Sequence, residues 1–203
     1  MDERFESGLS TVREEELENF RTFMLEVLRK EFEGRNPREL EMLNVACGYM
    51  REAPVLTGLF KKPIDAIDQV PYRIGAVREQ WSGENIRAIA GDANCLTEFY
   101  RKRSFDLILM RHPFIEFSPE ITKMDHEDQF PLYGACKKVL HPSGRMVSTF
   151  HIRDEMESAA RSIETFGYEI RGQGQNPDAI WEYGIEGFNG IDGYYMILSH
   201  AKD

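Results

Sequence analysis

The residues of this chain whose types and spacing suit ligand chemistry begin at positions 43–52. The sequence there, LNVACGYMRE, reads as an apolar strand, a tight turn at Gly48 and a helix that opens with charge. At the carboxyl end of a parallel strand such a turn lets the backbone approach a ligand closely, because glycine has no side chain in the way. Acidic residues follow the next two strand patterns, at Asp68 and Asp92. This spacing predicts a ligand site at the carboxyl ends of adjacent strands.

A second pair of chemically useful side chains, Arg111 and His112, follows the strand predicted at residues 105–110. Histidine ordinarily titrates near neutral pH, so an imidazole here suits a general base. A guanidinium here suits a substrate carboxylate or phosphate. The pair can equally well cap or brace the loop, and both interpretations stay open.

Strand and helix patterns alternate along the chain and must position these residues. An amphipathic N-terminal helix is predicted from Thr11, which has capping-box spacing with Glu14, to Phe32. The expected strands are residues 41–47, 64–67, 86–90, 105–110, 145–150, 168–171 and 194–200. The further helices are expected at 51–60, 72–81, 96–101, 125–140 (interrupted near Pro131) and 154–166. The alternation predicts an α/β fold, with a doubly wound, mostly parallel seven-stranded sheet and helices on both faces.

Two connections stand out in this pattern. Residues 141–144 read as a turn before the fifth strand. The long, glycine-rich stretch 172–193 reads as a loop, and loops of that length are often lids or binding loops. Its Trp181, Tyr183 and Phe188 would cover an aromatic or apolar substrate, although packing of the loop onto the sheet explains them equally well.

Composition limits the function classes. At 203 residues the chain is expected to be one domain, with residues 1–36 as an N-terminal helical extension. The net charge of −10 argues against nucleic acid as a partner. No apolar run reaches the length of about 18 residues that a membrane span needs. Three cysteines without disulfide or zinc spacing favour reduced thiols and a cytoplasmic location. His126 among acidic neighbours reads as a solvated helix start, so no metal is expected.

Over residues 37–203 the sequence resembles the class I S-adenosylmethionine-dependent methyltransferases. Four segments carry the resemblance: residues 43–52 with their turn, 64–68 with a terminal acid, 89–93 with the sequence IAGDA, and 139–145 with the sequence VLHPSGR. Each motif is weak alone, and their order and spacing make the likeness specific. The resemblance also implies that the last strand is antiparallel and closes the sheet.

The resemblance implies S-adenosylmethionine as the cofactor. Backbone amides after the first strand would hold its carboxylate, Asp68 its ribose hydroxyls, and Asp92 with the Ala93 amide its adenine. Asp68 is preferred over Asp65, which lies inside the strand, and either Asp68 or Asp92 can instead be a helix cap. The cofactor-binding residues expected on this basis are Ala46, Cys47, Gly48, Asp68, Asp92, Ala93 and Met110. His112 and Arg111 would be the catalytic residues.

The chain departs from the family pattern in its first motif. Asn44 stands where the family usually has an acid, Ala46 replaces the first glycine and Met50 the last. The leading hypothesis is a methyltransferase acting on an unidentified small molecule or protein. The alternative is a non-catalytic methyltransferase-like scaffold or regulatory protein with weakened cofactor binding. A nicotinamide-dependent oxidoreductase is disfavoured because the Gly-x-Gly-x-x-Gly pattern is missing. The sequence does not determine the oligomeric state.

Overall fold

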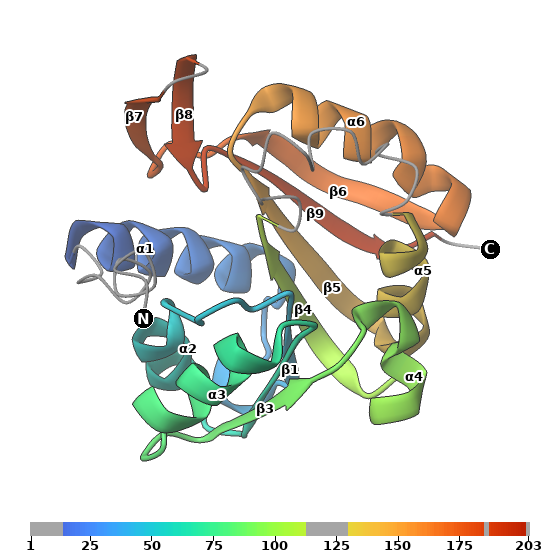
Figure 1. The fold of residues 1–203 in the computed structure, drawn as a ribbon. Coiled ribbons are helices and arrows are strands. Elements are labelled where there is room, and N and C mark those ends of the chain that lie inside the picture. The colour runs from blue at the N-terminus through green and yellow to red at the C-terminus, as the bar shows by residue number, and fades with distance from the viewer. Residues whose placement is uncertain (1–13, 113–129, 185–186, 202–203) are drawn as a thin grey trace.

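A seven-stranded sheet forms the centre of the molecule, as the computed structural model shows for residues 14–112, 130–184 and 187–201 (Figure 1). Its strands lie in the order β3-β2-β1-β4-β5-β9-β6. Their bounds are β1 Met42–Val45, β2 Ile64–Asp68, β3 Ile86–Ala90, β4 Phe105–Arg111, β5 Leu140–Phe150, β6 Tyr168–Gln175 and β9 Tyr194–His200. β1 to β5 pair in parallel, and β9 runs antiparallel to both neighbours, β5 and β6. The predicted doubly wound α/β sheet with an antiparallel last strand is confirmed.

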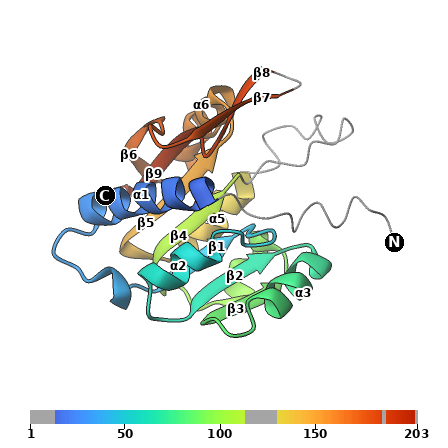
Figure 2. The ribbon, with the colours of Figure 1, turned by 90° about the vertical axis from the view of Figure 1, so that its left-hand side faces the viewer.

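Helices cover both faces of this sheet (Figures 1 and 2). They are α1 Glu14–Glu31, α2 Ala53–Leu59, α3 Pro71–Gln80, α4 Leu96–Phe99, α5 Phe130–Val139 and α6 Arg153–Ile163, with short 3-10 turns at η2 Pro37–Glu39, η3 Ala93–Cys95 and η5 Glu164–Phe166. α1, α2 and α3 pack on one face and α4, α5 and α6 on the other. In β4, Leu107 and Leu109 belong to the core on the α1–α3 side of the sheet. Ile108 and Met110 belong to the core on the α4–α6 side. The strand is apolar throughout because both of its faces are buried.

The N-terminal helix α1 belongs to the core on the α2 side. Its buried residues are Phe20, Phe23, Met24, Val27 and Leu28, at the helical spacing that predicted it. Thr11 of the predicted capping box lies outside the described residues, as does His126. The helix crosses the sheet near the carboxyl end of β4 (Figure 2), so its first turns border the candidate site.

Two predictions about connections need correction. The expected loop 172–193 is mostly regular, because β6 continues to Gln175 and a separate hairpin follows, β7 Ile180–Gly184 and β8 Gly187–Ile191. The segment's glycines and polar residues concealed its strands, although their backbone groups pair as a strand's must. Of the helix predicted at residues 125–140, the structure describes α5 from Phe130 onward, with Pro131 beside its first described residue, and residues 125–129 lie outside the described part of the chain.

The turn predicted at residues 141–144 lies inside β5. The pairing of β4 with β5 shifts there, from Phe105 opposite Leu140 to Leu107 opposite Arg145. Four residues of β5 are therefore accommodated as an irregularity in one strand rather than as a turn between two elements.

Candidate functional site

The loop between β1 and α2 has an unusual backbone. Ala46, Gly48 and Met50 have φ angles of 53°, 54° and 51°, so three alternate residues are left-handed. A residue with a side chain pays about 1–2 kcal/mol for this conformation, whereas glycine adopts it readily. These are the three positions at which the family pattern has glycine. The loop therefore keeps the conformation of a glycine-rich turn although only Gly48 is glycine.

Met50 packs beneath this loop. Its side chain is fully buried in the core on the α1–α3 face, with Met42 and Leu56 among the residues of that cluster. A Cβ built on Gly48 would meet no described atom within 4 Å, so the space beside Gly48 is open. The bulk of Met50 is thus directed into the protein and not into the open space where a ligand can approach the turn.

Asp68 connects the end of β2 to the same turn. One carboxylate oxygen accepts a hydrogen bond from the Gly48 amide at 2.9 Å, and the other accepts one from the Val70 amide at 2.9 Å. Asp68 is buried, and its own carbonyl accepts from the Gly91 amide at 3.0 Å. The predicted pair, Gly48 and Asp68, is therefore in direct contact, and Asp68 also caps the start of the connection to α3.

Asp92 and Ala93 lie at the end of β3, next to β2 in the sheet. The exposed Asp92 accepts a hydrogen bond from the Asn94 amide at 2.8 Å and so caps the η3 turn that begins at Ala93. This hydrogen bond supports the interpretation of Asp92 as a cap. A carboxylate has about four acceptor positions, so a cap and a ligand contact are compatible.

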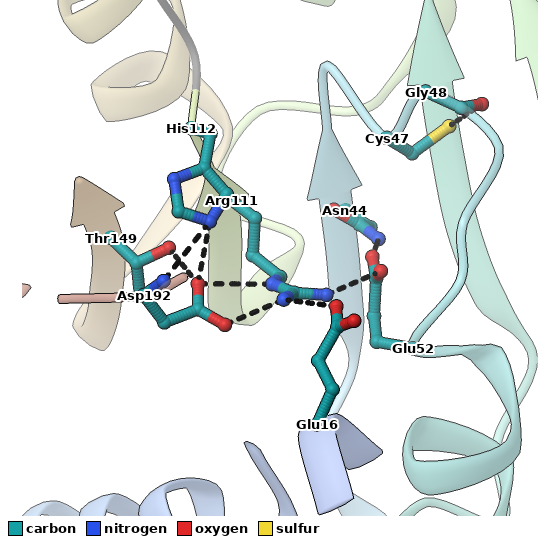
Figure 3. A network of polar contacts seen from close by, with 9 residues as sticks. All are labelled: Glu16, Asn44, Cys47, Gly48, Glu52, Arg111, His112, Thr149 and Asp192. Atoms are coloured by element: carbon teal, nitrogen blue, oxygen red, sulfur yellow. Dashed lines mark hydrogen bonds and ion pairs between the residues drawn. The ribbon is translucent and has the colours of Figure 1, made fainter. Parts of the chain in front are cut away.

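The predicted Arg111 stands at the centre of a buried ion-pair network (Figure 3). Its guanidinium contacts Asp192 through Nε and Nη2, Glu52 through Nη1 at 2.9 Å and Glu16 through Nη2 at 3.5 Å. Burial alone would lower the pKa of Arg111, but Asp192 and Glu52 outweigh it and raise the pKa above its ordinary value. Three carboxylates, each from a different segment of the chain, thus share one guanidinium. Arg111 therefore ties α1, the β1–α2 loop and the β8–β9 turn to the end of β4.

Asn44 is joined to this network. The fully buried side chain donates from its amide to Glu52, while its Oδ1 has no hydrogen-bond partner among the described residues. The family pattern has an acidic residue at position 44 itself. In this chain position 44 is asparagine, and the carboxylate next to it comes from Glu52.

His112 contacts the same Asp192 from the other side. Its Nε2 lies 3.0 Å from Oδ1 of Asp192, and its ring stacks on His151 with centroids 3.8 Å apart and an interplanar angle of 12°. Thr149 donates its hydroxyl to Asp192. Burial alone would raise the pKa of Asp192, but Arg111 and His112 hold it well below the usual range. Asp192 is therefore a fixed anion that links the two predicted catalytic residues.

Cys47 and Met110 are buried members of the site. Burial raises the pKa of the Cys47 thiol well above its ordinary value, and the nearby Asp68 and Glu52 add to the effect. A thiol kept protonated is a poor nucleophile. Met110 packs in the core on the α4–α6 side, directly before Arg111. Side-chain chemistry is therefore not expected from either residue, and each can contribute backbone groups and shape.

Sequence reasoning missed four members of the network: Glu16, Glu52, Thr149 and Asp192. Glu52 had a signal, because it belongs to the charged opening of the helix that follows the turn. Asp192 had one too, because Asp192-Gly193 is a pair typical of tight turns. Glu16 and Thr149 had none, since they reach the site only through the packing of α1 and β5.

Metal ligands do not gather in the described part of the chain, where no three His, Cys, Asp or Glu side chains form a potential site. Among the same residues, no helix combines the length and apolar character needed to cross a membrane.

No protein-family model matches this chain, and no curated protein sequence does. Solved structures do match. A SAM-dependent methyltransferase from Aquifex aeolicus is 15% identical with a TM-score of 0.65, over 97% of this chain and 98% of that one. Another from Clostridium acetobutylicum is 12% identical with a TM-score of 0.65, over 92% of each chain. The [4+2]-cyclase SpnF is 16% identical with a TM-score of 0.60, over 77% of this chain and 59% of that one. The chain therefore has the class I fold of the S-adenosylmethionine-dependent methyltransferases.

Proposed function

We propose that the protein binds S-adenosylmethionine at the β1–α2 loop and transfers its methyl group to a small-molecule or protein acceptor. The observation that carries the proposal is the left-handed turn at residues 46, 48 and 50, with open space beside Gly48 and the carboxylate of Asp68 against it. The class I fold supports the same ligand, since it places this turn at the carboxyl ends of the central strands.

The residues present fit the cofactor. Backbone amides near Cys47 and Gly48 suit its carboxylate. Each oxygen of Asp68 accepts one protein bond and retains a second acceptor position for a ribose hydroxyl. Asp92, with the Ala93 amide, suits the adenine edge. When bound, the cofactor supplies a methyl group activated by its cationic sulfonium.

The backbones of Ala46 and Met110 would border the cofactor, because each directly precedes a site residue at the end of its strand. Arg111 donates hydrogen bonds to Glu52 and Asp192 and is ion-paired with Glu16, so we assign it to holding Glu52 and Asp192 in place. Holding a substrate anion instead would require one of these ion pairs to break. His112 remains the candidate base.

Isothermal titration calorimetry with S-adenosylmethionine and with S-adenosylhomocysteine tests the proposal. Binding of either ligand should weaken about tenfold or more in Asp68→Ala, which removes a charge-assisted acceptor worth about 1.5–3 kcal/mol. The exposed His141→Gln serves as the matched surface control and should bind normally. No binding of either ligand by the unaltered protein would reject the proposal.

A non-catalytic, cofactor-binding relative is the second candidate. The closed network around Arg111 favours it, because the guanidinium at the end of β4 is already engaged. SpnF has a similar fold and is a [4+2]-cyclase, so this fold does not by itself imply methyl transfer. Cofactor binding without transfer of a labelled methyl group to any acceptor tested would favour this candidate.

A further inference from the structure

We infer that Asp192 positions His112 as a general base whose Nδ1 takes the proton, so that the methyl acceptor is a group that must lose a proton, such as a hydroxyl. This inference rests on the proposed function and adds to it a positioning residue, a reacting atom and a class of acceptor. The contacts among Asp192, His112 and Thr149 carry it (Figure 3), together with the stacking of His151 on His112.

Asp192 is held firmly as an anion. It occupies the two-residue turn between β8 and β9 with a φ of 53°, a conformation that aspartate tolerates better than most residues. Its buried carboxylate accepts from the Thr149 hydroxyl and from two nitrogens of Arg111. These donors fix both oxygens before His112 is considered, so the carboxylate is preorganised toward the imidazole.

The contacts of Nε2 decide which ring nitrogen of His112 carries the proton. Nε2 lies 3.0 Å from Oδ1 of Asp192 and 3.3 Å from the Asp192 backbone nitrogen. The contact with the carboxylate requires a proton on Nε2, because a carboxylate can only accept. The contact with the backbone N–H requires a lone pair on Nε2, because an N–H can only donate. The carboxylate contact is shorter and charge-assisted, and such bonds are about twice as strong as neutral ones. We therefore assign the proton to Nε2, which leaves the lone pair of the neutral ring on Nδ1.

Nδ1 is the ring nitrogen of His112 that the described residues leave without a partner. It is buried and has no hydrogen-bond partner among the described residues, in contrast to Nε2. A buried nitrogen without a partner is costly in a purely structural histidine. The missing partner of Nδ1 is explained if this nitrogen accepts a proton from the substrate during the reaction.

The ring is also fixed in place. The His112 amide donates to the Thr149 carbonyl at 3.1 Å, the backbone is left-handed with a φ of 45°, and His151 stacks on one ring face. His112 lies three residues beyond Leu109, which pairs with Asn44, and Cys47 lies three residues beyond Asn44. The base and the β1 turn are thus at the same level of two neighbouring strands.

The chemical step balances with these groups. With the cofactor bound, the acceptor oxygen would form a bond to the methyl carbon while the carbon–sulfur bond breaks, and the electron pair of that bond would stay on sulfur as a neutral thioether. The acceptor proton passes to Nδ1, and Asp192 stabilises the imidazolium that forms. An acceptor without a proton to lose, such as a thioether or a tertiary amine, would not need this base.

The assignment is tested by ¹⁵N–¹H correlation NMR on ¹⁵N-histidine protein, which has only five histidines. Neutral His112 should carry its proton on Nε2, and Asp192→Asn should reduce the population of that tautomer while His141→Gln leaves it unchanged. A proton on Nδ1 in the unaltered protein would overturn the inference, since no lone pair would face the substrate. This measurement needs no variant, so it decides the matter even if Asp192→Asn fails to fold.

Activity gives a second test, with methyl-labelled S-adenosylmethionine and a panel of alcohols, phenols and carboxylic acids beside matched thioethers and tertiary amines. Transfer should be confined to the acceptors that lose a proton. His112→Gln and Asp192→Asn should lower kcat about 100-fold or more, with cofactor affinity within about twofold. Transfer to a thioether that is insensitive to His112→Gln would overturn the inference. Failure of the unaltered protein to bind the cofactor would instead count against the proposed function alone.

Discussion

The carboxylate of Asp68 and the backbone amide of Gly48, 20 positions apart in the chain, lie 2.9 Å from each other. This bond joins the end of β2 to the turn after β1 and gives the turn an anionic neighbour. The sequence had singled out both residues, and the structure adds that they stabilise one another directly.

Asp68→Ala should lower the free energy of unfolding by about 2 kcal/mol, because the amides of Gly48 and Val70 both lose a charged acceptor. Urea denaturation measures it. Asp92→Ala is the matched control, since that exposed acid caps one short turn and its loss should cost about 0.5–1 kcal/mol. Equal costs for the two variants would contradict a structural role for the Asp68 bond.

Ala46→Gly should raise the free energy of unfolding by about 0.5 kcal/mol, because relief of the left-handed backbone slightly exceeds the entropy that glycine loses. Ala88→Gly, in β3, lacks this relief and also removes a buried methyl group, so it should lower stability by about 1 kcal/mol. The two changes are chemically identical and should have opposite signs in thermal or urea unfolding. The same sign for both would show that the conformation at Ala46 carries no strain.

Met50→Ala should destabilise the protein by about 2–5 kcal/mol, because it empties space in the core. Met50→Gly should then be no worse than Met50→Ala, since glycine suits the φ of 51°. At Met24, an equally buried methionine inside α1, glycine should be worse than alanine by about 1 kcal/mol. Cofactor affinity, measured by calorimetry, should change less than about twofold in Met50→Gly. A large gain in affinity would mean that the methionine obstructs the site.

Asp192→Asn should lower the free energy of unfolding by about 3 kcal/mol at pH 7, because it leaves Arg111 with one fewer buried partner. The pKa of Asp192 is held below that of an unfolded aspartate, so below about pH 4 the unfolded chain binds more protons than the folded one. Stability from this group is thus present above about pH 4 and is lost as the pH falls further.

The difference in stability between the unaltered protein and Asp192→Asn should therefore be smaller below pH 4 than at pH 5. Urea titrations at several pH values measure it. A difference that stays constant down to pH 2.5 would mean that this carboxylate does not titrate as an ion-paired group.

The regular strands could be predicted because their pattern is local. β3 and β9 begin and end at the predicted residues, since each is an apolar-rich run bounded by turn residues. The hairpin of β7 and β8 could not be predicted in the same way. Its β-forming residues, among them Trp181, Tyr183 and Phe188, are interrupted by three glycines, and the backbone pairing that makes the segment regular depends on the partner strand.

The sequence by itself determined the order of the helices and of the seven strands of the main sheet, and it placed Gly48, Asp68, Asp92 and His112 at strand ends, because periodicity and turn chemistry act between near neighbours. Only the tertiary structure decided that Met50 is directed into the core and that Arg111 meets Glu52 and Asp192, which lie 59 and 81 positions away. Buried charges must find partners, and the path of the whole chain determines which carboxylates lie within reach.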